Sequence, residues 1–259
     1  MPFADVSGAR LHYRFDGPAG APVLMLSNSL GTSLEMWAPQ MDALSSRYRV
    51  LRYDSRGHGQ SAVTPGPYDV ALLARDALGL LDALRIDHAL FCGLSLGGMV
   101  GQWLGANAPQ RITRLALCNT AAHMAAADAY NARIDAVVRG GMAAVVDAVI
   151  ARWYTPAFVA AAPDAIAGTR KMLLSTPAAG YVACCTAVRD MDQRGLVERI
   201  RVPTLVIVGA HDLATPPAAG RFLAEKIVGA RLVELPAAHL SNVEAAAAFT
   251  AALVEFLEA

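Results

Sequence analysis

The spacing of apolar residues along the chain predicts alternating strands and helices. Continuous apolar runs are typical of strands covered on both faces, and they occur at residues 22–26, 89–92, 114–119 and 203–209. Shorter strand patterns stand at residues 11–15, 49–54 and 230–235, the first of them as an edge strand. Helical spacing separates these segments, at residues 36–44, 69–84, 98–104 and 241–257. Because parallel strands need crossover connections, this alternation predicts a mostly parallel, doubly wound α/β sheet.

The strand rhythm stops after about residue 120 and resumes near residue 203. The intervening stretch is alanine-rich and helical in spacing. Pro156, Pro163 and Pro177 divide it into several short helices, because proline is excluded from helix interiors. We therefore expect an α/β core of residues 1–120 and 194–259, interrupted by a helical cap over residues 121–193.

The charge and the apolar content of the chain exclude several classes of binding partner. The 259 residues carry 22 basic and 22 acidic side chains, so no basic field is available for nucleic acid or an anionic membrane. No uncharged apolar run reaches the roughly 18 residues of a membrane helix, and no signal-peptide pattern is visible at the first residues. The expected partner is a small molecule.

The positions of the four cysteines indicate the cellular compartment and whether a metal is bound. Cys92 and Cys118 lie in apolar, strand-like stretches, while Cys184 and Cys185 are adjacent, a poor geometry for a mutual disulfide. Reduced thiols favour the cytoplasm. No Cys/His pair has the spacing of zinc ligands, so we expect no metal.

The most informative segment is Gly93-Leu94-Ser95-Leu96-Gly97, a G-x-S-x-G pattern between a predicted strand and a predicted helix. Such a tight turn requires small residues beside the serine and holds its hydroxyl at the carboxyl edge of the sheet. The next backbone N–H and the helix N-terminus then face any oxyanion that forms there. Ser95 is the predicted nucleophile.

A serine hydroxyl is a weak nucleophile and needs a base oriented by a third group. Asp212 follows the strand at residues 203–209, and His239 follows the last strand. The chain order serine, acid, histidine matches the order that accompanies this elbow. We predict that His239 takes the Ser95 proton and that Asp212 accepts the other imidazole N–H. The plainer alternatives are a loop acid and a surface-loop histidine.

Two backbone donors are expected to form an oxyanion hole. One is the N–H of Leu96, directly after the nucleophile, and the other is the N–H of Leu30, in the loop after the strand at residues 22–26. His58, in the glycine-punctuated loop that follows the next strand, is predicted to be structural.

Along nearly its whole length the chain resembles the α/β-hydrolase family. Residues 54–61, Asp-Ser-Arg-Gly-His-Gly-Gln-Ser, are similar to the family's D-x-R-G-x-G-x-S loop. Two positions depart from the family pattern. Asn28-Ser29 stands where the family usually has His-Gly before the oxyanion residue, and Ala238-His239 stands where it usually has Gly-His. Neither departure removes a required group, but the first changes the hydrogen bonding under the oxyanion loop.

A narrower resemblance is to the 3-oxoadipate enol-lactonases, bacterial enzymes of aromatic catabolism in the β-ketoadipate pathway. It rests on residues 28–32, 152–158 and 181–192. The resemblance implies hydrolysis of a carboxylated lactone through an acyl-enzyme, without a cofactor. An arginine suits the substrate's carboxylate, and Arg189 and Arg133 are the candidates, with Trp153 as a pocket wall.

Other functions remain open on the same residues. A carboxylesterase, a C–C bond hydrolase or a cofactor-free haloperoxidase can use the same triad. A small-molecule receptor that retains the hydrolase fold is an alternative from another class, since fold alone does not establish function. A carboxylesterase is expected to cleave neutral esters well, whereas a lactonase selective for a carboxylate is expected to cleave them poorly. Multiple turnover distinguishes an enzyme from a receptor.

Overall fold

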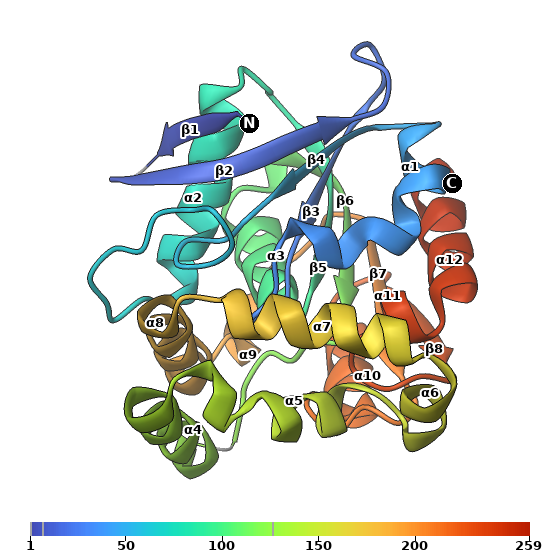
Figure 1. Ribbon diagram of the computed structural model, residues 1–259. Coiled ribbons are helices and arrows are strands. Elements are labelled where there is room, and N and C mark those ends of the chain that lie inside the picture. The colour runs from blue at the N-terminus through green and yellow to red at the C-terminus, as the bar shows by residue number, and fades with distance from the viewer. Residues whose placement is uncertain (1, 7, 126) are drawn as a thin grey trace.

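The computed structural model describes residues 2–6, 8–125 and 127–259. Within these residues the centre is an eight-stranded sheet in the order β1-β2-β4-β3-β5-β6-β7-β8 (Figure 1). The strands are β1 (Phe3–Val6), β2 (Ala9–Asp16), β3 (Val23–Ser27), β4 (Arg49–Tyr53), β5 (Ala89–Leu94), β6 (Ile112–Cys118), β7 (Thr204–Gly209) and β8 (Arg231–Leu235). All neighbours from β4 to β8 are parallel, while β1–β2 and β2–β4 are antiparallel. The predicted fold class is confirmed.

One strand was not predicted. β1 pairs antiparallel with β2, with Phe3 opposite His12, so β2 lies inside the sheet and its assignment as an edge strand is wrong. A strand of four residues is too short to show a clear alternation. The buried central strands match their continuous apolar sequences, because every residue of β5 and β7 is buried.

Helices cover both faces of the sheet (Figure 1). On one face α2 (Val70–Ala83) contacts α3 (Leu96–Asn107), and on the other the 3₁₀ helix η1 (Leu34–Gln40) contacts α12 (Ala246–Glu258). The remaining core helices are α1 (Met41–Ser45), η2 (Pro109–Arg111), α9 (Arg194–Val197), α10 (Pro217–Lys226) and α11 (Ser241–Glu244). The helix predicted at residues 36–44 is therefore mostly 3₁₀, with Pro39 inside it. The closing helix is divided at Ala245, whose φ of −119° and ψ of 46° are not helical.

A set of helices between β6 and β7 covers the carboxyl ends of the parallel strands (Figure 1). These inserted helices are α4 (Ala127–Gly140), η3 (Met142–Ala144), α5 (Val146–Trp153), α6 (Pro156–Ala161), α7 (Pro163–Ser175) and α8 (Ala178–Asp190). Pro156 and Pro163 begin α6 and α7, and Pro177 directly precedes α8. The division at the three prolines is confirmed, since proline fits the first position of a helix but not its interior.

The described residues contain no helix that is long and apolar enough to span a membrane. Within the same residues, no group of three or more His, Cys, Asp or Glu side chains could hold a metal ion. The four cysteines are free and buried. Cys92 Sγ and Cys118 Sγ are 3.8 Å apart, well beyond the roughly 2.05 Å of a disulfide bond.

Candidate active site

Ser95 stands at the turn between β5 and α3. Its backbone angles are φ +57° and ψ −112°, a conformation that residues with a Cβ rarely adopt. The Ser95 N–H donates to Cys118 O at 2.9 Å, and Thr120 Oγ1 donates to Ser95 O at 2.8 Å. Strain of this kind persists only where the surroundings enforce it, and it is typical of functional positions.

Close backbone contacts explain the glycines that flank Ser95. A Cβ on Gly93 would lie 2.1 Å from Gly97 O, and a Cβ on Gly97 would lie 2.2 Å from Ser27 O. The Gly97 N–H also donates to Asn28 O at 3.0 Å. The turn is thus packed backbone against backbone on the loop after β3, which only glycine allows. This contact places Ser95 next to the loop that carries Leu30.

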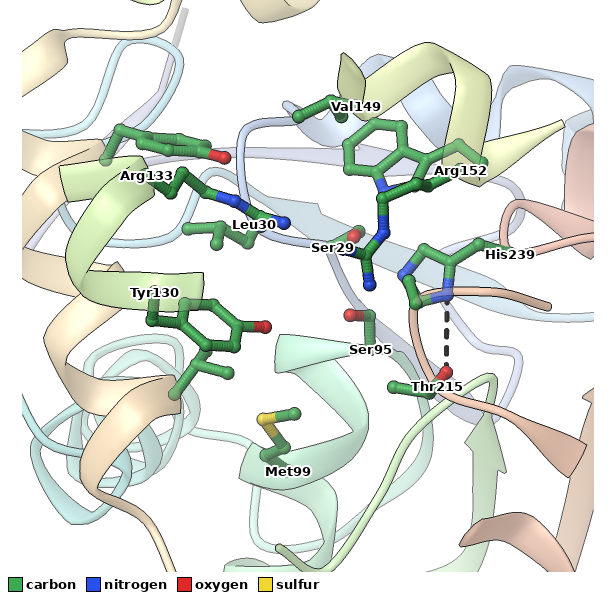
Figure 2. A pocket seen from close by; sticks show the side chains of 14 residues that line it. Ser29, Leu30, Ser95, Met99, Tyr130, Arg133, Val149, Arg152, Thr215 and His239 are labelled. Carbon is green, nitrogen blue, oxygen red and sulfur yellow. Dashed lines mark hydrogen bonds between the residues drawn. The ribbon is translucent and has the colours of Figure 1, made fainter. Parts of the chain in front are cut away.

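Asp212 follows β7 and His239 follows β8, and their side chains form a hydrogen-bonded pair. His239 Nδ1 and Asp212 Oδ2 are 2.8 Å apart, and both side chains are buried. Because Nδ1 faces the carboxylate, Nε2 is the ring nitrogen that remains for the cavity, where His239 lies beside Ser95 (Figure 2). The structure therefore brings together the three residues predicted as nucleophile, base and acid.

Asp212 is ionised within a network of donors that sequence reasoning missed. Thr215 Oγ1 donates to Oδ2 at 2.8 Å, Asn119 Nδ2 donates to Oδ2 at 3.0 Å, and the Thr215 N–H donates to Oδ1 at 2.9 Å. Burial by itself raises the pKa of Asp212, but the pairing with His239 and these donors outweigh it and hold the pKa below its usual value. Asn119 follows β6 at the same sheet edge. Its positive φ of +43° could not be predicted from the sequence.

Leu30 lies in a turn whose neighbouring backbone groups are engaged in hydrogen bonds. The Thr32 N–H donates to Ser29 O at 3.2 Å, and the intervening Gly31 has φ +81°. The Gly31 N–H donates to His58 Nε2 at 2.8 Å, and Gly31 O accepts from Thr176 Oγ1 at 2.9 Å. Among the described residues, the N–H groups of Leu30 and Leu96 donate to no other group. Both remain available for an oxyanion.

His58 supports this turn from the loop after β4. It is buried, and its Nδ1 lies 3.2 Å from Arg56 O. Burial lowers the pKa of His58, which favours the neutral ring that has a proton on Nδ1 and a free acceptor at Nε2. Thr176 lies between α7 and α8, so the inserted helices hold the same turn from the other side.

Ser95 and His239 open into a small cavity between the sheet edge and the inserted helices (Figure 2). It measures about 30 Å³ and is lined by Ser29, Leu30, Ser95, Met99, Tyr130, Arg133, Val149, Arg152, Trp153, Tyr181, Val188, Ala214, Thr215 and His239. Trp153 forms a wall, with its ring centroid 5.9 Å from that of His239. Arg133 also reaches the cavity, against the Tyr130 ring at 5.0 Å. Both residues therefore lie where the sequence predicted a substrate pocket.

Arg189 does not reach the cavity, and this expectation is corrected. Its guanidinium pairs with Asp190 at 2.7 Å and donates to Asn131 at 2.8 Å, on the outer side of α8. The sequence does not reveal which face of α8 is turned outward. Arg152, at the end of α5, was not predicted but lines the cavity. Its Nη2 donates to Leu213 O at 2.9 Å, and its buried Nε bonds to no described residue.

The fold and this site define a class of enzyme. The family model of the α/β hydrolase fold matches residues 22–148. Similar proteins align with nearly the full length of the chain. The chain belongs to the α/β-hydrolase family, in which an elbow of this kind carries the nucleophile.

Within that family the chain is similar to enol-lactonases. It is 42% identical to 3-oxoadipate enol-lactonase 2 of Acinetobacter baylyi, over 94% of this chain and 91% of the relative. It is 39% identical to 3-oxoadipate enol-lactonase 1 of the same organism, over 92% and 89%. The crystal structure of the enol-lactonase from Burkholderia xenovorans LB400 superposes with a TM-score of 0.98 at 49% identity, covering 100% of both chains. The predicted resemblance is confirmed.

Proposed function

We propose that this enzyme hydrolyses 3-oxoadipate enol-lactone to 3-oxoadipate in bacterial aromatic catabolism, in the cytoplasm. The observation that carries the chemistry is the Asp212–His239 pair, whose histidine lines one cavity with the strained Ser95 and with Leu30. The similarity to 3-oxoadipate enol-lactonases over nine-tenths of the chain supports the choice of lactone. We assign residues 121–193 to the cap that closes the cavity and the rest of the chain to the core.

The proposed reaction has two stages. His239 Nε2 accepts the proton of Ser95 as Oγ attacks the lactone carbonyl, and the N–H groups of Leu30 and Leu96 stabilise the tetrahedral oxyanion. Asp212 fixes the imidazole tautomer and stabilises the imidazolium. Collapse breaks the ring C–O bond, and His239 returns the proton to the leaving enol oxygen. The ring opens to an acyl-enzyme, and tautomerisation of the enol to a ketone draws the reaction forward.

Water then resolves the acyl-enzyme. His239 removes a proton from the water as it attacks the same carbonyl, and the oxyanion is held again by the two backbone donors. Collapse returns the proton to Ser95 and releases the second carboxylate of 3-oxoadipate. No step requires a metal or an organic cofactor.

Arg133 is the proposed partner of the substrate's free carboxylate. Its guanidinium lies on the side of the cavity opposite His239 (Figure 2), so a lactone with its carbonyl at Ser95 and its carboxylate arm turned away from His239 would meet it. Burial opposes the charge of Arg133, but the phenols of Tyr181 and Tyr130 outweigh it and raise its pKa. Arg152 lies close to Ser95, where the new carboxylate forms. Trp153 supplies an apolar wall for the ring.

Admission of the lactone requires a rearrangement of the lining. A cavity of about 30 Å³ holds about two waters, at roughly 10–15 Å³ each, which is less than a lactone with a carboxylate arm needs. Tyr130, Arg133, Arg152 and Ala214 also line an outer cavity of about 370 Å³. Displacement of the long side chains among them joins the two spaces, so we propose the outer cavity as the route of the substrate.

The test is turnover of freshly generated 3-oxoadipate enol-lactone, followed by loss of its absorbance, beside turnover of p-nitrophenyl acetate. We expect fast lactone opening and feeble ester cleavage, with both abolished in Ser95→Ala. Fast ester cleavage without lactone opening would refute the substrate and favour a carboxylesterase. Near wild-type activity of a folded Ser95→Ala variant would refute the nucleophile.

A further inference from the structure

Ser29 carries a buried hydroxyl for which the described part of the chain offers no hydrogen-bond partner. The residue is 2% exposed, and its Oγ makes no hydrogen bond to any described residue. Its backbone is engaged, because Ser29 O accepts from both the N–H and the Oγ1 of Thr32, at 3.2 and 2.7 Å. A hydroxyl buried without a partner destabilises a folded protein. When such a group lines a binding cavity, the missing partner is expected from the ligand.

The position of Ser29 in the cavity indicates which group of the substrate its hydroxyl would meet. Ser29 lines the same cavity as Ser95, Leu30 and His239, and Figure 2 shows it next to Leu30 and above Ser95. A cavity of about 30 Å³ holds about two waters, so before its lining rearranges it admits only a small group of the substrate. The group that must occupy the space beside Ser95 and Leu30 during the reaction is the carbonyl oxygen under attack. Ser29 also stands where the α/β-hydrolase pattern has glycine, so the hydroxyl is added to the usual pair of donors.

We propose that Ser29 Oγ is a third donor of the oxyanion hole. Its hydroxyl donates a hydrogen bond to the substrate's carbonyl oxygen, and this bond strengthens as negative charge develops in the tetrahedral intermediate. The proton stays on Ser29, and no covalent bond of the residue changes. The hydroxyl rotates about its C–O bond, so it follows the oxygen as the carbon changes from trigonal to tetrahedral. The two amide donors are held by the backbone.

The proposed role of Ser29 differs from the roles of the other polar side chains in the cavity. The guanidinium groups of Arg133 and Arg152 already supply charged donors for carboxylates. Ser29 and Leu30 are consecutive, so their donors approach one oxygen from the same turn. The hydrogen bonds of Gly31 to His58 and Thr176 fix the backbone of that turn, and with it the positions of the Ser29 Cβ and the Leu30 N–H.

The experiment is the Ser29→Ala variant, assayed on 3-oxoadipate enol-lactone and on p-nitrophenyl acetate. We expect kcat to fall about tenfold or more on both substrates, since loss of one oxyanion donor lowers kcat by up to about 10³-fold. KM is expected to stay within about twofold, because the bond strengthens in the transition state. The free energy of unfolding in urea is expected to stay close to that of the wild type, because the deleted hydroxyl bonds to no described residue.

Ser27→Ala is the matched control. Ser27 is also buried, two residues earlier, but its Oγ pairs with Tyr53 OH at 2.8 Å and does not line the cavity. This variant is expected to lose stability while its kcat stays at the wild-type value. The two serines thus predict opposite outcomes: Ser29→Ala loses rate without stability, and Ser27→Ala loses stability without rate.

Three results would overturn the proposal: an unchanged kcat in Ser29→Ala, a loss of kcat that matches a loss of folded protein, or a loss confined to the lactone. The last would place the hydroxyl on the leaving oxygen or the carboxylate instead. The proposal rests on the proposed function of Ser95, but it does not depend on the lactone. If the wild type cleaves only the ester, the substrate assignment fails and the Ser29 comparison is still decided on the ester.

Discussion

Replacement of His58 tests how the oxyanion loop is held in place. His58→Leu removes the acceptor of the Gly31 N–H and the donor to Arg56 O, which are bonded at 2.8 and 3.2 Å. The Gly31 N–H is left without its acceptor, whereas Arg56 O still accepts from Cys184 Sγ at 3.7 Å. A buried polar group left without a partner costs about 1–3 kcal/mol, so the expected loss of stability is about 1–3 kcal/mol. His58→Gln has an amide oxygen that can replace the Nε2 acceptor. It is therefore expected to lose less than half as much.

The same change is expected to reduce catalysis through Leu30. Without the hydrogen bond from the Gly31 N–H to residue 58, the N–H of Leu30 is no longer held in position to donate to the oxyanion. Complete loss of such a donor costs about 3 kcal/mol of transition-state stabilisation. We expect kcat of His58→Leu to fall at least about tenfold with KM nearly unchanged, and His58→Gln to recover most of the rate. Urea unfolding and steady-state kinetics of p-nitrophenyl acetate hydrolysis measure both effects. His88→Leu is the control, since His88 is exposed.

The pH dependence of stability gives a second measurement on His58. Burial lowers its pKa in the folded protein below the usual 6.5, against smaller opposing effects of the Arg56 backbone and Asp54. Below pH 6.5 the unfolded chain therefore binds more protons at this residue than the folded protein does. The resulting stability is complete above pH 6.5 and is lost as the pH falls towards the folded pKa. Wild type should lose stability between pH 7 and 5 more steeply than His58→Gln. Equal slopes, or a kcat of His58→Leu within twofold of wild type, would refute the reasoning.

Three further predictions concern the elbow, the acid and the carboxylate site. Gly93→Ala is expected to unfold or grossly distort the elbow, because its Cβ would lie 2.1 Å from Gly97 O; circular dichroism and esterase activity should both be lost, and a folded, active variant would contradict the contact. Asp212→Asn is expected to lower kcat by about 10⁴-fold through the wrong His239 tautomer. Since the pKa of Asp212 is lowered in the folded protein, wild type should also lose more stability than this variant as the pH falls below about 4; parallel urea curves at pH 3–6 would argue against an ionised Asp212. Arg133→Met is expected to raise KM for the lactone at least about tenfold and to leave p-nitrophenyl acetate unaffected, because a charge-assisted pair contributes about 1.5–3 kcal/mol. Arg189→Met, on the outer side of α8, should leave both unchanged, and equal effects of the two substitutions would remove Arg133 from the site.

Much of the core was predictable because its signals are local. Strands buried on both faces are typically continuous apolar runs, so β3, β5, β7 and the buried end of β6 could be located from such runs in the sequence. The elbow is equally local, since a turn without room for side chains requires glycine at fixed positions around Ser95. Asp212 and His239 were predicted from their places after two strands, because carboxyl ends of parallel strands meet at one edge.

The sequence by itself thus determined seven of the eight strands and the elbow, whose signals come from neighbours a few positions away, and the places of Asp212 and His239 after two of those strands. Only the tertiary structure decided which cap arginine faces the cavity, because α5 and α8 each present several faces and their packing selects one. It also decided that Asn119 and Thr215 support Asp212, and that His58 and Thr176 hold Gly31. These contacts join residues as far as 145 positions apart. Their geometry comes from packing between elements, which no local pattern of hydrophobic and polar residues records.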